Sequence, residues 1–410
     1  MKIGMFTDTY SPQINGVVTS IISFENELMR QGHEVHIFAP RFPGYKDDGN
    51  HIHRFPSVDI FFIEGYRLAI PTLWEIMATI RKLKLDIVHS HDPFPLGLVA
   101  LRVSRAESIP LVHTYHTLYE EYLHYLPRII RLRKKRVERI SRIYCDRCDL
   151  VLSPSERIRE LLIKYGVGSR IEVLPTGVDL HEFESLLPGE EEEAQEKKNK
   201  DIRLIYVGRV AKEKNIEFLF DVMDKVRSRV PRVVLRVVGG GPELPHLKRV
   251  CQESELADIV SFSGFVDRKG VVKELRQSDI FVFSSLTETQ GLAILEAMAT
   301  GLPVVAVDAM GASQLIEHGR EGFLTGLDVD QFVDHVLKLI RNPSLRQEMG
   351  RLARDKATAN SLTHVTGRLL DLYGECIDAA GDRRKNVPRR MVRARSLAET
   401  GKGFSKIIWS

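Results

Sequence analysis

The sequence lacks the features that define several large protein classes. Its four cysteines among 410 residues are too few for a disulfide framework. No run of about 18 uncharged apolar residues is present to span a bilayer. The formal net charge is only +4, so no overall field favours nucleic acid. The N-terminus has neither the long apolar run nor the small-residue cleavage site of a signal peptide. We therefore expect a reduced, cytoplasmic protein.

A structural zinc site is not indicated either. Cys145 and Cys148 form a lone CxxC pair inside an Arg-rich, helical stretch, and no second pair lies near them in the sequence. Structural zinc needs four ligands, so this pair alone does not predict one.

The first half of the chain alternates short apolar strands with helices. Gly16 opens a helix over Val17–Arg30. The expected strands are Ile3–Phe6, Val35–Ala39, Ile87–His89, Leu111–Thr114, Val151–Pro154 and Glu172–Leu174. Short buried strands separated by helices predict a doubly wound parallel sheet.

The pattern stops at a charged stretch and then restarts. Pro188–Asp201 has almost no apolar residues and is typical of a solvated connector. Strands follow at Arg203–Val207, Val233–Val238, Ile259–Phe262, Ile280–Phe283 and Val304–Val307, with helices from Asn215 and over Ala293–Thr300. We predict an α/β protein with a first domain over residues 1–182, a linker over 183–200, a second domain over 201–360 and a basic tail over 381–410. A periodic helix over 361–380 would cross back to complete the first domain.

Charged residues follow two strands of the second domain. Arg209 and Lys214 come directly after the strand that ends at Val207, where a phosphate-facing loop belongs. Glu288 follows the strand Ile280–Phe283, and Gly291 precedes a helix that carries Glu296 about two turns later. Amides at the start of that helix suit a phosphate, and the two acids suit hydroxyl groups. The combination predicts a site for a nucleotide diphosphate sugar.

These motifs resemble the retaining glycosyltransferases of family 4, which have the GT-B fold of two Rossmann-like domains facing a cleft. The resemblance covers residues 1–380 and is carried by YVGRVAKEKN, VVGGGPE, FSGFVD and SSLTETQGLAILEAMATGLPVVA. It implies that Arg209 and Lys214 hold the diphosphate, Glu288 the sugar hydroxyls and Glu296 the ribose. It further implies donor contacts at the positions Gly16, Val266, Gln290, Gly291 and Leu292. The glycines at 239–241 have the wrong spacing for a dinucleotide motif, and we expect a tight turn there.

His116 matches a histidine that the family places beside the reacting sugar. In the mechanism usually proposed for the family, the leaving phosphate takes the acceptor proton, so His116 is not expected to be the base. Members of this fold generally need no metal, and we expect neither a metal nor a cofactor besides the nucleotide sugar. We therefore interpret His89, His91 and Asp92 as the end of a strand that lines the cleft.

Local sequence narrows the donor and the acceptor. Two segments resemble those of bacterial enzymes that glucosylate diacylglycerol from UDP-glucose: HTYHTLYEEY and TETQGL. Many mannosyl-transferring relatives have Phe at the position of Gln290, and some guanine-binding relatives have an acid at that of Arg268. The resemblance therefore favours UDP-glucose and diacylglycerol, with GDP-mannose and phosphatidylinositol, or a soluble acceptor, as the alternative.

Three segments predict contact with an anionic membrane surface. A basic amphipathic helix is expected over Leu126–Tyr144, and such a helix lies well on anionic lipid. Packing of its apolar stripe on the domain core is the competing interpretation. Residues 61–74 and the end of the tail add aromatic groups. The contact residues that we predict are Arg131, Lys134, Lys135, Arg136, Trp74 and Trp409.

Functions of other classes fit less well. A catalytically silent nucleotide-sugar-binding or scaffold protein would be expected to lose one of the five site residues, yet all are present. A nucleic-acid binder would explain the basic stretch Arg128–Arg147, but no aromatic stacking platform accompanies it. We therefore expect a peripheral enzyme at the cytosolic face of the membrane.

Overall fold

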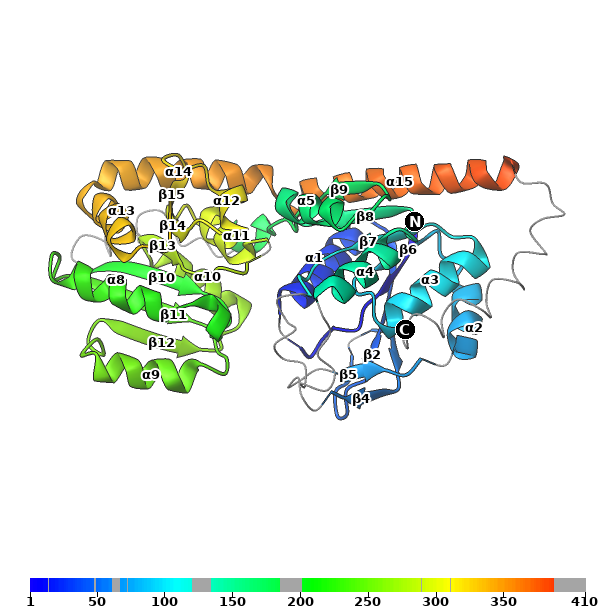
Figure 1. Cartoon of the computed structure of the whole chain (residues 1–410), viewed down its shortest axis with the longest axis horizontal. Coiled ribbons are helices and arrows are strands. Elements are labelled where there is room, and N and C mark those ends of the chain that lie inside the picture. The colour runs from blue at the N-terminus through cyan, green and yellow to red at the C-terminus, as the bar shows by residue number, and fades with distance from the viewer. Residues whose placement is uncertain are drawn as a thin grey trace. The chain divides into compact units, whose positions relative to one another are not determined.

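The chain forms two compact units (Figure 1). The computed structural model describes residues 1–13, 15–47, 49–60, 67–71, 73–119, 134–184, 201–288, 290–309 and 311–386. Unit 1 comprises Met1–Ser153, Arg159–Leu174 and the chain from Gly367 onward, and unit 2 comprises Pro154–Ile158 and Pro175–Thr366. Helix α15 (Leu362–Asn386) therefore begins in unit 2 and belongs to unit 1 from Gly367.

Unit 1 contains a parallel sheet of seven strands in the order β3-β2-β1-β6-β7-β8-β9. The strands are β1 (Lys2–Phe6), β2 (Glu34–Pro40), β3 (Ile52–Phe55), β6 (Ile87–Ser90), β7 (Leu111–Thr114), β8 (Leu150–Ser153) and β9 (Ile171–Val173). The helices along this part of the chain are α1 (Gly16–Arg30), α2 (Leu73–Leu83), α3 (Pro95–Glu107), α4 (Lys134–Cys145) and α5 (Glu156–Lys164). The predicted doubly wound sheet is confirmed.

Two features of unit 1 were not predicted from the sequence. The edge strand β3 is only partly buried and carries His53 and Arg54, so it has no apolar run. A two-stranded antiparallel sheet pairs β4 (Ser57–Asp59) with β5 (Arg67–Ala69). Three-residue strands with exposed side chains give no periodic signal.

Unit 2 repeats the architecture with six parallel strands in the order β12-β11-β10-β13-β14-β15. The strands are β10 (Ile202–Val207), β11 (Val233–Val238), β12 (Val260–Gly264), β13 (Ile280–Phe283), β14 (Val304–Val307) and β15 (Gly322–Thr325). The helices are α6 (Leu180–Glu184), the 3-10 turn η3 (Lys212–Lys214), α8 (Glu217–Arg227), α9 (Leu244–Glu253), α10 (Arg268–Arg276), α11 (Leu292–Ala299), α12 (Ala312–Leu315), α13 (Val329–Arg341) and α14 (Pro343–Ala359).

The central strands of unit 2 are continuous apolar runs because both faces of the sheet are covered. All four residues of β13 and of β14 are buried. Phe281 and Phe283 are almost fully enclosed, and burying such a side chain stabilises the fold by about 2–3 kcal/mol. The sequence signal for these strands was therefore strong, and their bounds agree with the prediction.

Strand order reverses between β1 and β6 in unit 1 and between β10 and β13 in unit 2. In doubly wound sheets, ligands bind beyond the carboxyl ends of the strands at such a reversal. The loop after β10 carries Arg209, and the loop after β13 carries Glu288. The fold of unit 2 thus brings these two loops to the expected ligand-binding edge.

Candidate active site

Two basic residues follow the carboxyl end of β10. The hydroxyl of Tyr206 donates to the carbonyl of Arg209 at 3.2 Å, and the hydroxyl of Ser284 donates to the carbonyl of Lys214 at 2.9 Å. These bonds fix the backbone of each basic residue to strand β10 or to the end of β13. The guanidinium of Arg209 is exposed and has no ion-pair partner within the described stretches. It is therefore available to an anionic ligand.

Lys214 and Glu288 form an ion pair in unit 2. Lys214 Nζ lies 2.8 Å from Glu288 Oε2, and the amide of Gly291 donates to Glu288 Oε1 at 3.3 Å. Burial alone would raise the pKa of Glu288, but the charge of Lys214 and the amides of Gly291 and Gln290 lower it below its usual value. Glu288 is consequently ionised near neutral pH and can accept hydrogen bonds from hydroxyl groups.

The loop between Glu288 and α11 is held by glycines. Gly291 has a φ of 71°, and a Cβ there would lie 3.0 Å from Leu315 Cδ1. The amide of Gly311 donates to the carbonyl of Glu288 at 2.7 Å. Gln290 and Leu292 are half-buried beside Gly291, and Leu292 is the first residue of α11. The predicted strand-loop-helix arrangement is confirmed, whereas the ligand contacts of these residues stay predictions.

Glu296 is buried on α11 and pairs with a basic residue that the sequence did not link to it. Arg268 Nη1 donates to Glu296 Oε1 at 2.5 Å, and Arg268 Nε donates to Glu182 Oε2 at 2.6 Å. Burial would lower the pKa of Arg268, but the two carboxylates outweigh it and raise that pKa. The sequence separations are 28 and 86 residues, so no local pattern could reveal this cluster.

Val266 lies on the loop between β12 and α10, with 36% of its surface exposed. Its neighbour Phe265 is 71% exposed, and a Cβ on Gly240 would lie 2.4 Å from the Phe265 ring. Gly239 has a φ of 135°, as the expected tight turn requires. An exposed aromatic ring beside the predicted base-binding residue is a feature that the sequence analysis missed, although its place after a strand could have indicated it.

Gly16 begins helix α1 in unit 1. The side chain of Asn15 accepts hydrogen bonds from the amides of Val17 and Val18, both at 3.0 Å, and so caps this helix. A Cβ on Gly16 would meet no atom of the described chain within 4 Å. The packing of unit 1 therefore does not explain a glycine here, and the ligand contact of Gly16 stays a prediction.

His116 is buried in unit 1 beside a second histidine. His91 Nδ1 and His116 Nε2 are 2.9 Å apart, and their rings are stacked. Burial, with a smaller effect of His113, lowers the pKa of His116 to about 3. His116 is thus neutral near pH 7. Its bond to His91 restricts which ring nitrogen carries the proton.

The neighbouring HSHDP segment forms the end of strand β6 and the loop after it, which confirms its interpretation as a strand end. His89 lies within hydrogen-bond distance of Tyr373 Oη and Thr114 Oγ1, at 2.6 and 2.7 Å. Asp92 accepts from Thr7 Oγ1 at 3.0 Å, and burial raises its pKa to about 6. In the described part of the chain, no group of three His, Cys, Asp or Glu side chains is arranged to hold a metal. Cys145 and Cys148 are buried, free thiols.

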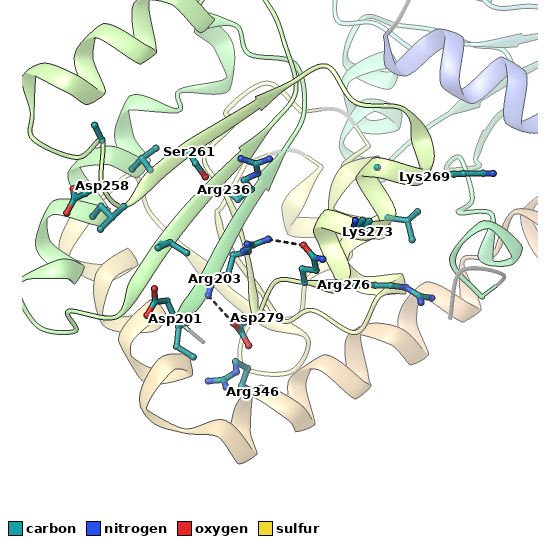
Figure 2. A pocket seen from close by; sticks show the side chains of 18 of the residues that line it. Asp201, Arg203, Arg236, Asp258, Ser261, Lys269, Lys273, Arg276, Asp279 and Arg346 are labelled. Atoms are coloured by element: carbon teal, nitrogen blue, oxygen red, sulfur yellow. Dashed lines mark hydrogen bonds between the residues drawn. The ribbon is translucent and has the colours of Figure 1, made fainter. Parts of the chain in front are cut away.

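A hollow of unit 2 has a volume of about 1030 Å³ (Figure 2). Arg203 and Arg236 from the sheet, and Lys269 and Lys273 from α10, contribute to its lining. Arg203 belongs to the amino end of β10, and the lining also includes Val260 and Ser261 at the start of β12. It therefore lies away from the carboxyl ends that carry the predicted donor residues, and we do not assign the donor to it.

Known proteins match this chain along most of its length. Residues 14–182 match the family model described as Glycosyltransferase Family 4, and residues 189–356 match that described as Glycosyl transferases group 1. The alpha-monoglucosyldiacylglycerol synthase of Streptococcus pneumoniae is 36% identical over 323 residues, which is 75% of this chain and 71% of that protein. The enzyme of the same name from Acholeplasma laidlawii is 30% identical over 370 residues, which is 87% of this chain and 91% of that protein. The chain belongs to glycosyltransferase family 4.

A further relative and two solved structures also resemble this chain. A GDP-mannose-dependent alpha-mannosyltransferase of Mycobacterium tuberculosis is 29% identical over 386 residues, which is 91% of this glycosyltransferase and 96% of that protein. The structure of a sucrose-phosphate synthase from Thermosynechococcus elongatus superposes with a TM-score of 0.73 at 19% identity, covering 92% of this chain and 99% of that one. The Anabaena HepE structure in complex with UDP gives the same score and identity, with coverage of 92% and 100%. The predicted GT-B fold is confirmed.

The residues of this glycosyltransferase that we predicted to contact a membrane are only partly described. Arg131 and Trp409 lie outside the described residues, whereas Lys134, Lys135 and Arg136 are exposed at the start of α4. Trp74 on α2 is 81% exposed. Near it in sequence, the exposed residues Val58 and Leu68 face each other across β4 and β5. No helix in the described stretches is long and apolar enough to cross a membrane.

Proposed function

We propose that this glycosyltransferase moves glucose from UDP-glucose to diacylglycerol, with retention of the α configuration, at the cytosolic face of a membrane. The observation that carries the proposal is the similarity, at 36% and 30% identity, to two alpha-monoglucosyldiacylglycerol synthases. A site with two basic and two acidic residues supports it, because such a site suits a diphosphate joined to a sugar and a ribose.

The chemistry follows from the charges of unit 2. The bond between the sugar C1 and the β-phosphate oxygen breaks, and a bond forms between the acceptor hydroxyl oxygen and C1 on the same face. The acceptor proton passes to the leaving phosphate oxygen. Arg209 and Lys214 stabilise the charge that develops on the phosphate. Because Glu288 is ionised, it holds the sugar hydroxyls rather than donating a proton.

His116 has a supporting part in this reaction. A buried imidazole whose pKa is about 3 is a poor base near neutral pH, because its protonated form is strongly disfavoured. We assign His116 to contact with the reacting sugar. The proposed reaction uses no metal and no cofactor besides the nucleotide sugar.

The absence of an acid at the position of Arg268 favours a uracil donor over a guanine donor. A guanidinium has only hydrogen-bond donors, and the N1 and N2 groups of guanine are donors as well. An acid at this position would accept from guanine, and Arg268 does not offer that. We therefore propose UDP-glucose as the donor.

Diacylglycerol resides in a membrane, so the enzyme must reach its surface. The exposed basic start of α4 and the exposed ring of Trp74 supply charge and an interfacial aromatic group in unit 1. Cations near an anionic surface each contribute about 1 kcal/mol. We propose peripheral binding through these residues.

The test is transfer of labelled sugar into diacylglycerol liposomes. Purified protein is incubated with labelled UDP-glucose or GDP-mannose, with and without a chelator. We expect label in the lipid from UDP-glucose only, unaffected by the chelator. Label from GDP-mannose alone would contradict the glucosyl assignment, and loss of activity with chelator would contradict the metal-free reaction.

A mannosyl transfer is the second candidate. The 29% identity over 386 residues to a GDP-mannose-dependent alpha-mannosyltransferase favours it. In that case phosphatidylinositol or another acceptor replaces diacylglycerol. Liposomes that contain phosphatidylinositol, assayed in parallel with both donors, separate the two candidates.

A further inference from the structure

Arg268 connects three segments of unit 2. It is the first residue of α10 and lies two residues after Val266. Its guanidinium bonds Glu296 on α11 and Glu182 on α6, at 2.5 and 2.6 Å, and its Cζ lies 5.3 Å from the centre of the Phe183 ring. A charged side chain with two ion pairs and an aromatic contact has little freedom to move.

The charge of this cluster decides which part of a donor it can receive. Glu296 is only 9% exposed, and within the described chain Arg268 is its ion-pair partner. Two carboxylates and one guanidinium leave a net charge of −1. Such a site repels phosphate and suits hydroxyl groups, which donate hydrogen bonds.

One oxygen of Glu296 stays available. Arg268 bonds Oε1, and among the described residues this is the hydrogen bond that the Glu296 carboxylate makes, so Oε2 is not used. A bond to a planar guanidinium fixes the plane of the carboxylate, and therefore the direction of both oxygens. Without Arg268, a buried carboxylate would lose both its compensating charge and its orientation.

We propose that Arg268 is a positioning residue that orients Glu296 to accept hydrogen bonds from the 2′ and 3′ hydroxyls of the donor's ribose. This inference rests on the proposed nucleotide-sugar donor. It adds a residue whose effect on the ribose passes through Glu296, with Glu182 holding the guanidinium from its other side.

The test compares binding of UDP and 2′-deoxy-UDP to the full chain by calorimetry. The wild-type chain should prefer UDP by about 10-fold or more, as expected for a hydroxyl bonded to a carboxylate. In Arg268→Ala this ratio should fall towards one. Arg268→Lys should restore part of it, because an ammonium keeps a cation beside Glu296. Lys273→Ala, which changes the same helix on the side of the hollow in Figure 2, should retain the wild-type ratio.

A double variant separates positioning from general damage to the fold. Glu296→Gln should also lose the ribose preference, and Arg268→Ala combined with it should add almost no further loss. Equal weakening of UDP and 2′-deoxy-UDP in Arg268→Ala would mean a merely structural role and overturn the inference. An unchanged ratio, or no preference in the wild type, would overturn it as well.

The same measurements distinguish this inference from the proposed function. If the wild-type chain binds GDP more tightly than UDP, the glucosyl assignment fails. The role of Arg268 is then tested with GDP and 2′-deoxy-GDP. If it binds neither nucleotide, both proposals are wrong. If it binds UDP but the ratio of its affinities for UDP and 2′-deoxy-UDP is the same in Arg268→Ala, only the inference about Arg268 fails.

Discussion

Lys214 and Glu288 pair with each other, yet each has a different part of the donor as its predicted ligand. Lys214 Nζ and Glu288 Oε2 are 2.8 Å apart, with 17% and 23% of the side chains exposed. The pair holds both groups at the carboxyl end of the sheet before a donor binds. In the proposed reaction, the ionised Glu288 accepts hydrogen bonds from the sugar hydroxyls and Lys214 faces the phosphate.

Glu288→Ala should reduce transfer by at least 100-fold and unfolding free energy by only about 1–2 kcal/mol, because the pair is partly solvated. Transfer into liposomes and chemical denaturation measure the two effects. Glu317→Ala, which removes an exposed acid paired with Arg320, is the matched control and should change neither. Substantial remaining activity in Glu288→Ala would place the sugar elsewhere.

Gly16→Ala should leave stability unchanged or raised by up to about 1 kcal/mol, since alanine favours the first turn of a helix and meets no atom within 4 Å. The donor KM should rise at least 10-fold, because the added methyl occupies the space predicted for the ligand. Gly374→Ala on α15 is the control, as its Cβ would also meet nothing within 4 Å. An unchanged KM in Gly16→Ala would show that this loop does not face the donor.

At the scale of elements, α4 has two faces with different tasks. Val137, Ser141 and Tyr144 are buried, and the hydroxyl of Tyr144 bonds the carbonyl of Gly97 at 2.9 Å. In the described half of the expected amphipathic helix, the apolar stripe thus packs on the core of unit 1. Membrane contact by this half must therefore come from its basic face.

Replacing Lys134, Lys135 and Arg136 with Ser should weaken binding to anionic liposomes by roughly 100-fold at low salt, at about 1 kcal/mol for each cation. The effect should shrink as salt increases, because screening weakens these contacts. Liposome sedimentation at several ionic strengths measures it. Lys269→Ser with Lys273→Ser, a basic face of α10 in unit 2, should retain wild-type binding. Unchanged binding in the triple variant would leave α4 with packing as its only role.

At the scale of the whole molecule, buried histidines should make the fold sensitive to acid. Burial lowers the pKa of His116 to about 3 and of His113 to about 4. Unfolded histidine titrates near 6.5, so below about pH 6.5 the unfolded chain binds protons that the folded chain does not. Each of the two histidines should therefore lower the unfolding free energy by about 2 kcal/mol when the pH falls from 7 to 5. Asp92, with a pKa raised to about 6, acts in the opposite direction and offsets about 1 kcal/mol.

Unfolding free energy, measured by denaturant titration, should therefore fall by at least about 2 kcal/mol from pH 7 to pH 5. In His116→Gln the fall should be about 2 kcal/mol smaller, because one titrating group is gone. Identical slopes in wild type and His116→Gln would contradict a neutral, buried His116.

Much of the fold could be predicted because its signals are local. Strands such as Ile280–Phe283 and Val304–Val307 are apolar runs between turns, and parallel sheets covered on both faces require such runs. The edge strand β3 and the β4–β5 pair could not be predicted. Their side chains are mostly only partly buried or exposed, so they have no alternation of buried and exposed positions in the sequence. The candidate site residues were predicted at positions where a strand ends and a charged loop begins.

The sequence by itself determined two doubly wound sheets and the placement of Arg209, Lys214, Glu288 and Glu296 near strand and helix ends. Only the tertiary structure decided which side chains meet. Arg268 joins Glu296 and Glu182, and His91 joins His116, across 25 to 86 residues of chain. Such pairs depend on the order of strands in a sheet and on how loops converge at its edge. Neither the strand order nor the convergence of the loops can be inferred from periodicity and spacing along the chain.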